Sequence, residues 1–277
     1  MPTDMETLIL RAEGAVLFAA IDAPPMNLLG PELVRDLITL IQRAEADDTV
    51  QVLVFSSANP DYFISHVDVT RITEQRVEAE KFNGEASLGL LFRHLSTSRL
   101  VTITQISGRV RGVGSEFALA CDMRFAARET AIFGQPEIAF GLIPGGGAIQ
   151  HLAGLSGRAR ALETILSAND YDADVAERYG WINRALPDDE LDDFVHSLAH
   201  RIAGFPAPGR AWVKARLDAL TLAPAEDFRR DTDFFLEAAA SAETQQRIKS
   251  AFAHGFQTPQ GELALGQMLT ELGKVPA

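Results

Sequence analysis

Hydrophobic positions in the first half of the chain fall into short runs that predict the strands of a mixed α/β fold. The pair Glu13-Gly14 lies between two such runs and favours a hairpin turn. Residues 52–55 are apolar at every position, which is typical of a strand buried on both faces. The predicted strands cover residues 7–10, 15–21, 52–55, 100–106, 123–126 and 131–133.

Apolar residues at helical spacing predict helices between and after these strands. One apolar stripe runs through residues 74–97 and predicts a single long helix there, and a shorter helix is expected over 115–120. Beyond residue 145 the pattern is helical, apart from a predicted strand at 181–184. Pro31 suits the first turn of a helix whose apolar face holds Leu33, Leu37, Leu40 and Ile41.

The stretch Phe205-Pro206-Ala207-Pro208-Gly209 is the clearest boundary in the chain. Residues 1–204 are long enough for one α/β core that would carry the activity. Residues 205–277 hold amphipathic helices that are too few for an independent core. We therefore expect an α/β core with a helical C-terminal extension.

Charge and composition narrow the classes of partner. The 277 residues carry a formal net charge of −13, whereas a nucleic-acid-binding protein needs a basic face, so no nucleic-acid partner is expected. No apolar run is long enough to span a membrane, and residues 1–6 do not resemble a secretory signal, so no membrane partner is expected. A single cysteine, Cys121, excludes an intrachain disulfide and suits a reducing compartment, so a cytoplasmic location is expected.

Two segments combine a strand, a loop and a helix start. In the first, Ser65 and Asp68 have the spacing of a helix N-cap and its capping-box partner. The second, residues 106–122, runs from a strand through glycines into a short helix, with Glu116 in its first turn. N–H groups near Val113 would then lie at the positive end of a helix dipole, where an anion is stabilised. The third glycine of a dinucleotide-binding loop is absent from this segment.

A third segment, residues 133–147, places Glu137 directly after a proline and among apolar residues. Burial in such surroundings raises the pKa of a carboxyl group, which suits a general acid or base. Both glutamates also have an ordinary interpretation. Glu116 would complement its helix dipole, and Glu137 would accept N–H bonds within a turn.

Together these segments resemble the crotonase family, the enoyl-CoA hydratases and isomerases. Residues 63–68 are similar to the family's Phe-x-x-Gly-x-Asp loop, with His66 in place of the glycine. Residues 107–122 resemble its glycine-rich run, and residues 133–145 match its Phe-Gly-x-Pro-Glu run, the most specific of the three. Pro25-Met26-Asn27 is similar to an early family segment, and the resemblance covers about residues 7–220.

The resemblance implies a crotonase-like spiral of ββα units, followed by C-terminal helices that mediate trimerisation. It implies an acyl-CoA thioester as the substrate, with no separate cofactor because coenzyme A is part of that substrate. The family binds the thioester oxygen with two backbone N–H groups, which correspond here to Val67 and Val113. The hydratases activate water with two carboxylates, which correspond to Glu116 and Glu137. The other residues expected to contact substrate are Ser65, His66, Asp68, Val69, Thr70, Gly112 and Gly114.

Three positions depart from the family pattern. His66 and Val113 replace glycines, and Arg111 lies where an apolar residue is usual. A backbone N–H survives each change, but the room beside it is reduced, and the β-branched Val113 is stiff. His66 is open to three interpretations: an additional acid/base group, a contact to the pantetheine arm, or packing.

Retention of both carboxylates favours addition or removal of water across the 2,3 double bond of an enoyl-CoA. An isomerase, decarboxylase or hydrolase of the same family is the second hypothesis, and a non-catalytic acyl-CoA-binding protein is the third. Lys214, Arg216 and Arg210 are candidates either for contacts to CoA phosphates or for a polar helix face. A homotrimer or a dimer of trimers is expected because one core would not cover the C-terminal apolar residues Phe228, Phe234, Phe235 and Leu236.

Two other chemistries find little support in the sequence. His196 and His200 lie four apart on a predicted helix, a spacing that can hold zinc. No third ligand is evident, and the neighbouring Asp192 and Asp193 suggest a solvated face, so no metal is expected. Residues 154–157 do not form the nucleophile elbow of a Ser/His/Asp hydrolase.

Overall fold

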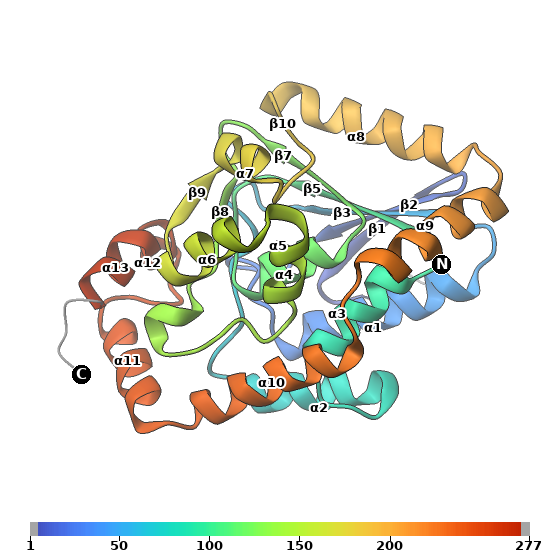
Figure 1. Cartoon of the computed structure of the whole chain (residues 1–277). Helices are drawn as coiled ribbons and strands as arrows, with labels where there is room; N and C mark the ends of the chain where they lie inside the picture. The colour runs from blue at the N-terminus through green and yellow to red at the C-terminus, as the bar shows by residue number, and fades with distance from the viewer. Residues whose placement is uncertain (1–4, 273–277) are drawn as a thin grey trace.

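Two β-sheets form the centre of the computed structural model, which describes residues 5–272, and helices surround them (Figure 1). The larger sheet contains, in spatial order, β1 (Leu8–Glu13), β2 (Val16–Ile21), β3 (Val52–Ser57), β5 (Val101–Ile106), β7 (Met123–Ala127) and β10 (Arg184–Leu186). The smaller sheet contains β4 (Tyr62–Ile64), β6 (Arg109–Arg111), β8 (Ile132–Gly134) and β9 (Asp170–Asp172), also in that order.

From β3 to β8, successive strands alternate between the two sheets. β1 and β2 form the predicted antiparallel hairpin, and β2, β3, β5, β7 and β10 then pair in parallel. After each of β3, β5 and β7, the next strand joins the smaller sheet as β4, β6 or β8, and a helix follows. Parallel neighbours need such crossovers, because a tight turn cannot join them. The repeated strand–strand–helix unit confirms the predicted spiral.

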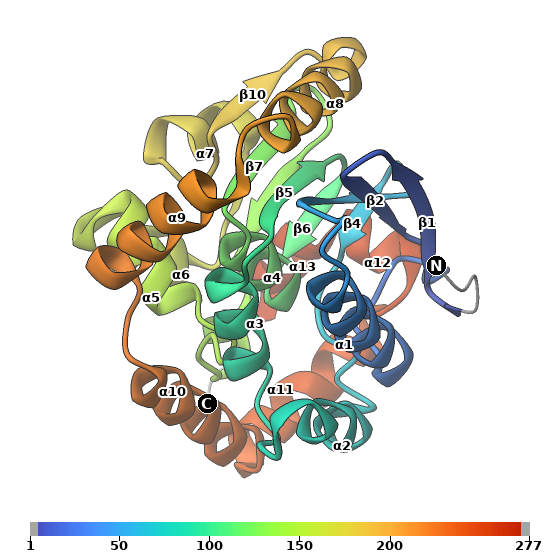
Figure 2. The same cartoon turned by 90° about the vertical axis from the view of Figure 1, so that its right-hand side faces the viewer.

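Helices connect the strands and then continue to the C-terminal end of the described chain (Figure 2). The connecting helices are α1 (Pro31–Ala46), α2 (Ile72–Asn83), α3 (Leu88–Thr97), α4 (Val113–Ala120), the 3₁₀ helix η1 (Glu137–Phe140), α5 (Ala148–Ser156), α6 (Arg158–Ser167), α7 (Ala173–Tyr179) and α8 (Asp188–Ala203). The C-terminal helices are α9 (Ala207–Thr221), α10 (Ala225–Ala239), α11 (Ala242–Ala253), α12 (Pro259–Leu263) and α13 (Leu265–Leu272). They wrap around the core, since α9 and α10 contact α3 and α11 contacts η1.

The larger sheet is covered on both faces, which explains the uninterrupted apolar run of β3. Val52 and Val54 pack with Val195 of α8, whereas Leu53 and Phe55 belong to the main core on the other face. Alternate side chains of a strand point to opposite faces, so a strand covered twice must be apolar throughout. No helix in the described part of the chain is long and apolar enough to cross a membrane.

The single long helix predicted over residues 74–97 is wrong. α2 ends where Gly84 adopts a left-handed conformation (φ 82°) and donates its N–H to Glu80. The side chain of Ser87 then accepts a hydrogen bond from Leu90 N–H and begins α3. Glycine is the usual residue at a left-handed helix end and serine a favoured N-cap, so local capping overrides the continuous apolar stripe.

Two smaller predictions also need correction. Ser65 and Asp68 do not cap a helix, because α2 begins at Ile72 and the residue preceding it is Arg71. The strand predicted at 181–184 is displaced and forms β10 only from Arg184 onward. Trp181 lies in the turn before that strand and is buried at 1% exposure, so its apolar character reflects packing within the core.

Candidate active site

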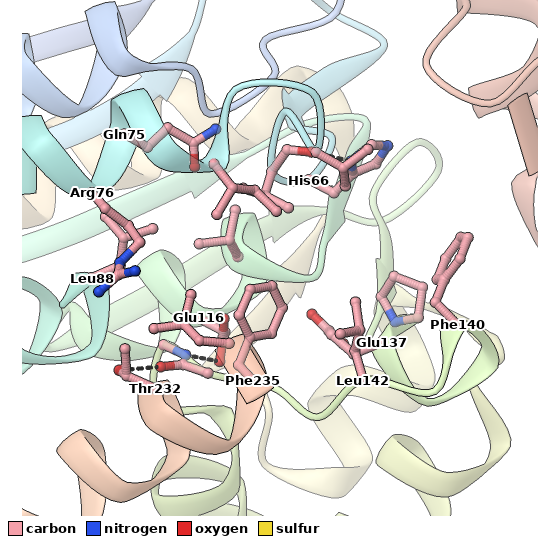
Figure 3. Close-up of a pocket in the computed structure, with 18 of the residues that line it drawn as sticks. His66, Gln75, Arg76, Leu88, Glu116, Glu137, Phe140, Leu142, Thr232 and Phe235 are labelled. Atoms are coloured by element: carbon pink, nitrogen blue, oxygen red, sulfur yellow. Dashed lines mark hydrogen bonds between the residues drawn. The ribbon is translucent and has the colours of Figure 1, made fainter. Parts of the chain in front are cut away.

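A largely apolar cavity lies where the loop after β4, α4 and η1 meet the C-terminal helices (Figure 3). The loop after β4 contributes His66, Val67 and Val69 to its wall. α4 contributes Val113 and Glu116, η1 contributes Glu137, and α10 contributes Thr232, Phe235 and Leu236. The fold therefore brings both predicted carboxylates and both predicted oxyanion donors to one cavity.

The carboxyl group of Glu116 is held by the loop that precedes α5. Its Oε1 accepts hydrogen bonds from the N–H groups of Gly146, at 2.7 Å, and Ala148, at 3.1 Å. The side chain is only 3% exposed, and a methyl group added at Gly146 would lie 2.7 Å from Oε2. With Oε1 held by backbone donors, Oε2 is the oxygen left for chemistry in the cavity.

Glu137 is fixed by a chain of polar side chains that sequence reasoning missed. The amide of Gln135 is assigned with its nitrogen toward Glu137, donating to Oε2 at 3.0 Å and to Oε1 at 3.2 Å. In that orientation its oxygen accepts from the hydroxyl of Ser115 at 3.1 Å. Ser115 in turn accepts from the indole N–H of Trp181, also at 3.1 Å. Each group in the series forms a hydrogen bond with the next, and these bonds hold the carboxyl group of Glu137 in one orientation.

Both carboxyl groups have raised pKa values. Burial raises the pKa of Glu116 to about 7, against the lowering effect of the N–H bonds from Ala148 and Gly146. Burial also raises the pKa of Glu137 well above its usual range, and the nearby charge of Glu116 raises it further. Two interacting acids titrate as a pair, so the first proton lost belongs to the pair and the remaining one is harder to remove. Near neutral pH the site therefore holds one carboxyl that keeps its proton and one that can ionise.

The two predicted oxyanion donors lie on the cavity wall with their N–H groups outside the backbone pairing. Val67 forms an isolated parallel bridge with Leu29. The bonds of that bridge run from Leu29 N–H to His66 and from Asp68 N–H to Leu29, so they do not use the N–H of Val67. Val113 is the first residue of α4, a position whose N–H has no acceptor within its own helix.

Five residues predicted to contact substrate do not line this cavity and instead support the loops. Ser65 is fully buried and its hydroxyl donates to the carbonyl of Met26. Asp68 accepts from the N–H and hydroxyl of Thr70, at 3.0 and 2.6 Å. A methyl group at Gly112 would lie 2.8 Å from Oε1 of Glu137, and one at Gly114 would lie 2.2 Å from the carbonyl oxygen of Ile64. Gly114 allows α4 to approach β4 closely, and Gly112 leaves room for the carboxyl group of Glu137.

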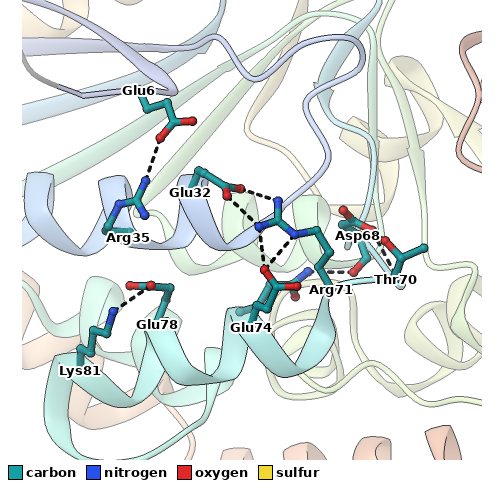
Figure 4. Close-up of polar contacts among 10 residues, drawn as sticks. Glu6, Glu32, Arg35, Asp68, Thr70, Arg71, Glu74, Glu78 and Lys81 are labelled. Carbon is teal, nitrogen blue, oxygen red and sulfur yellow. Dashed lines mark hydrogen bonds and ion pairs between the residues drawn. The ribbon is translucent and has the colours of Figure 1, made fainter.

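An ion-pair network fastens this loop to α1 (Figure 4). The guanidinium of Arg71 makes two hydrogen bonds to Glu32 of α1, at 2.8 and 2.7 Å, and also bonds Glu74. Two parallel bonds to one carboxylate fix orientation as well as distance. The backbone around Val67 is therefore restrained at both ends, by Leu29 before it and Arg71 after it.

Two of the three departures from the family pattern, His66 and Arg111, share a structural reason, because both bind the C-terminal segment. Nε2 of His66 lies 2.9 Å from Oε1 of Glu262 in α12, and both side chains are buried. Arg111 donates to the carbonyl oxygen of Glu262 at 2.9 Å and makes two 2.7 Å bonds to Asp170 of β9. The imidazole of His66 also stacks on Phe256, with ring centroids 4.7 Å apart. His66 therefore packs against the C-terminal segment at the edge of the cavity that it helps to line, and a contact to pantetheine or an acid/base role stays a prediction.

The candidate phosphate-binding residues are placed differently from expectation. Lys214 bonds the carboxylate of Asp122 at 2.8 Å, and Arg210 bonds the carbonyl oxygen of Ile202 at 3.1 Å, so both have partners within the chain. Neither lines the cavity that holds the two glutamates. Arg76 of α2 does, and among the described residues of that wall it carries the only permanent positive charge. The sequence offered no signal that singled it out.

Comparisons with known proteins agree with this geometry. The sequence profile of the enoyl-CoA hydratase/isomerase family matches residues 11–256, so the chain belongs to that family. A Rhizobium meliloti protein assigned as an enoyl-CoA hydratase is 31% identical, over 89% of this chain and 95% of its own length. The short-chain-enoyl-CoA hydratase of Clostridium acetobutylicum is 31% identical, over 72% and 76% respectively.

Solved structures give the same result for the fold. A crystal structure of a Streptomyces avermitilis protein assigned as an enoyl-CoA hydratase superposes with a TM-score of 0.96 at 48% identity. The match covers 100% of both chains, including the C-terminal helices. An enoyl-CoA hydratase from Mycobacterium avium subsp. paratuberculosis shares the fold, with a TM-score of 0.78 at 24% identity.

Proposed function

We propose that this protein adds water to, or removes it from, the 2,3 double bond of an enoyl-CoA thioester, with no separate cofactor. The observation that carries the proposal is the pair Glu116 and Glu137, which line one apolar cavity and have raised pKa values. Hydration needs one group to take a proton from water and another to give a proton to the α-carbon. Two carboxyl groups that titrate as a pair, one protonated and one ionised, supply both.

The proposed roles follow from the two environments. Glu116, whose pKa is about 7, accepts a proton from the water whose oxygen bonds to C3. Glu137, whose pKa is raised by burial and by the charge of Glu116, remains protonated and donates its proton to C2. The π electrons of the double bond form the new C2–H bond by way of an enolate. In the reverse direction each group performs the opposite transfer, as microscopic reversibility requires.

The enolate would be stabilised by the backbone N–H groups of Val67 and Val113. Both residues line the cavity, and the backbone pairing around them leaves these N–H groups unused. Preorganised donors act on negative charge that develops on the thioester oxygen, and losing one typically reduces the rate by about 10²–10³. The positive end of α4 adds to the effect at Val113.

A direct assay tests this function. The untagged protein is incubated with a series of trans-2-enoyl-CoAs of increasing chain length, and hydration, double-bond migration and ligand binding are measured in parallel. The proposal requires hydration of at least one member of the series. Migration without hydration would indicate an isomerase, and binding without turnover would indicate a non-catalytic acyl-CoA-binding protein; either result contradicts the proposal.

We also propose a homotrimer or a dimer of trimers, although the apolar surface differs from that expected. Of the four residues expected to be exposed, Phe228 is fully buried, Phe235 and Leu236 are half-buried on the cavity wall, and Phe234 is 54% exposed. α9 instead has no buried residue and exposes Trp212 at 70% and Leu220 at 66%. An apolar patch of this kind supports an interface between chains. Light scattering of a monomer at micromolar concentration would contradict the assembly without affecting the catalytic proposal.

A further inference from the structure

Three side chains of metal-binding type meet outside the cavity, between the first hairpin and α8. His196 and His200 lie one turn apart on α8, and Glu13 is the last residue of β1. Nε2 of His196 is 2.8 Å from Oε2 of Glu13, and Nε2 of His200 is 3.2 Å from the same oxygen. One candidate ligand atom from each residue lies within 4.8 Å of the other two. The third ligand that the sequence did not reveal is therefore supplied by the fold, from 183 residues away.

Packing of α8 on the larger sheet creates this meeting point. Val195 of α8 is buried against the sheet, which turns the neighbouring His196 and His200 toward the hairpin. The ring of Phe18 in β2 stacks on His196, with centroids 5.6 Å apart and an interplanar angle of 11°, and lies 6.1 Å from the ring of His200. Contact with an aromatic ring limits the rotation of both imidazoles, and a ligand set held in advance needs less ordering when an ion binds.

We propose that Glu13, His196 and His200 form a binding site for a divalent transition-metal ion, with Zn²⁺ as the best match. Zinc is bound by imidazole nitrogen and carboxylate oxygen, and a site with three protein ligands leaves the fourth position to water. Metal–ligand distances of about 2.0–2.1 Å place tetrahedral ligand atoms about 3.3 Å apart. The observed contacts of 2.8 and 3.2 Å are within about half an ångström of that separation. The third separation, between the two histidine nitrogens, is within 4.8 Å, so side-chain rotation has to bring them to this spacing when the ion binds.

The charges around the site permit a cation. Arg11 pairs with Oε1 of Glu13 and lies over the Phe18 ring at 4.4 Å, so it leaves Oε2 to the two histidines. Its positive charge opposes metal binding, but its side chain is 57% exposed and therefore well screened by water. The net charge of −13 also favours approach of cations.

The ordinary alternative is a hydrogen-bonded cluster that only fastens the hairpin to α8. A matched control for it exists elsewhere on the surface. Nε2 of His94 lies 2.9 Å from Oε2 of Glu45, so this pair has the same histidine–carboxylate contact but no second histidine. A chelating site needs all three ligands, whereas a hydrogen-bonded pair does not bind zinc specifically. Substitutions at the two locations therefore separate the alternatives.

Zinc binding to the untagged, full-length, chelator-treated protein tests the proposal. We expect one Zn²⁺ per chain with a dissociation constant of about 10 µM or tighter, measured by competition with a chromophoric chelator. His200→Ala, His196→Ala and Glu13→Gln should each weaken binding by at least about 10-fold, and His94→Ala should leave it unchanged. His200→Cys should retain zinc, because a thiolate is also a zinc ligand, whereas a purely structural histidine would not be replaced in this way.

Circular dichroism of every variant at the assay temperature establishes that it is folded. The Cys variant keeps the proposal falsifiable even where an alanine variant unfolds. Absence of saturable binding to the parent protein would overturn the proposal. Binding that survives all three ligand substitutions, or that is lost in His94→Ala, would overturn it equally.

Discussion

His66 and Glu262 join the candidate oxyanion loop to the C-terminal segment through a buried contact of 2.9 Å between Nε2 and Oε1. Nδ1 of His66 lies 2.7 Å from the carbonyl oxygen of Val67, which only accepts, so Nδ1 carries a hydrogen. A residue that replaces a family glycine thus connects a proposed catalytic loop to a helix 196 residues further along the chain, between positions 66 and 262.

Breaking this pair should be costly. Glu262→Gln and His66→Ala should each lower the free energy of unfolding by about 3 kcal/mol, because each leaves a buried group without its partner. Glu45→Gln, at the half-exposed pair with His94, should cost less than about 1 kcal/mol. Urea unfolding of the two single variants and the double variant measures the coupling, which should exceed about 1 kcal/mol. Strictly additive effects would show that the two side chains do not interact.

The same pair should also affect how the free energy of unfolding falls at acid pH. Burial alone would raise the pKa of Glu262, but His66, the N–H of Gln257 and Arg111 together lower it. A lowered carboxyl pKa contributes stability that is present above the usual value and is lost as pH falls through the folded-state value. Below about pH 4.5 the parent should therefore lose stability that Glu262→Gln does not lose. If the free energy of unfolding fell equally with pH in the parent and in Glu262→Gln, this prediction would be contradicted.

Val113→Gly should preserve or improve binding of short enoyl-CoAs. Val113 lines the cavity at the first residue of α4, and glycine keeps its N–H while removing the β-branched side chain beside it. Isothermal titration with an unreactive short acyl-CoA measures the effect, with Val113→Ala as an intermediate case. Much weaker binding by a folded Val113→Gly protein would show that this loop does not hold the thioester.

Arg76→Ala should weaken binding of the CoA moiety. Arg76 is exposed and lies on the wall of an otherwise largely apolar cavity, so its charge is available to a phosphate. We expect KM for an enoyl-CoA to rise about 10-fold, a loss of about 1.4 kcal/mol, with little change in kcat. A truncated thioester that lacks the nucleotide should show no such change. Lys81→Ala on the same helix, whose amine pairs with Glu78, is the matched control. Equal effects on both substrates would exclude a phosphate contact.

Local turn and helix-start signals predicted the elements they mark, and the family motifs predicted which two carboxylates would share a site. The hairpin at Glu13-Gly14, the helix start at Pro31 and the meeting of Glu116 with Glu137 are all observed. The break between α2 and α3 was also present in the sequence, as Gly84 and Ser87, but the continuous apolar stripe concealed it. In that segment the capping residues were the better guide.

The contacts that escaped prediction join residues far apart in the chain. Ser115 and Trp181, which support Glu137 through Gln135, are separated by 66 residues, and Glu13 lies 183 residues from His196. Hydrophobic periodicity reports on one element at a time and carries no information on which polar side chains will meet. His66 could be recognised as unusual, but its partner Glu262 became visible only in the folded chain.

Glu116→Gln should change how stability depends on pH. The folded-state pKa of about 7 is above the usual 4.5, so ionisation of Glu116 disfavours the folded state. The stabilising effect of the raised pKa is present below about pH 4.5 and is lost as pH rises through 7. The variant should therefore gain up to about 3 kcal/mol relative to the parent between about pH 5 and pH 8. Denaturant unfolding at one fixed protein concentration measures this gain. A difference in the free energy of unfolding between variant and parent that stays the same at every pH would contradict burial of an ionising carboxyl.

The most direct measurement of the central claim is the rate of enoyl-CoA hydration by Glu137→Gln. Glutamine keeps the size and polarity of the side chain but cannot supply the proton for C2, and general acid catalysis is typically worth about 10²–10⁴ in rate. We predict a loss of at least about 100-fold in kcat with nearly unchanged ligand affinity, and a similar loss in Glu116→Gln, whereas Glu129→Gln, at an exposed carboxylate, should be fully active. Full hydration activity in Glu137→Gln would contradict the proposed mechanism.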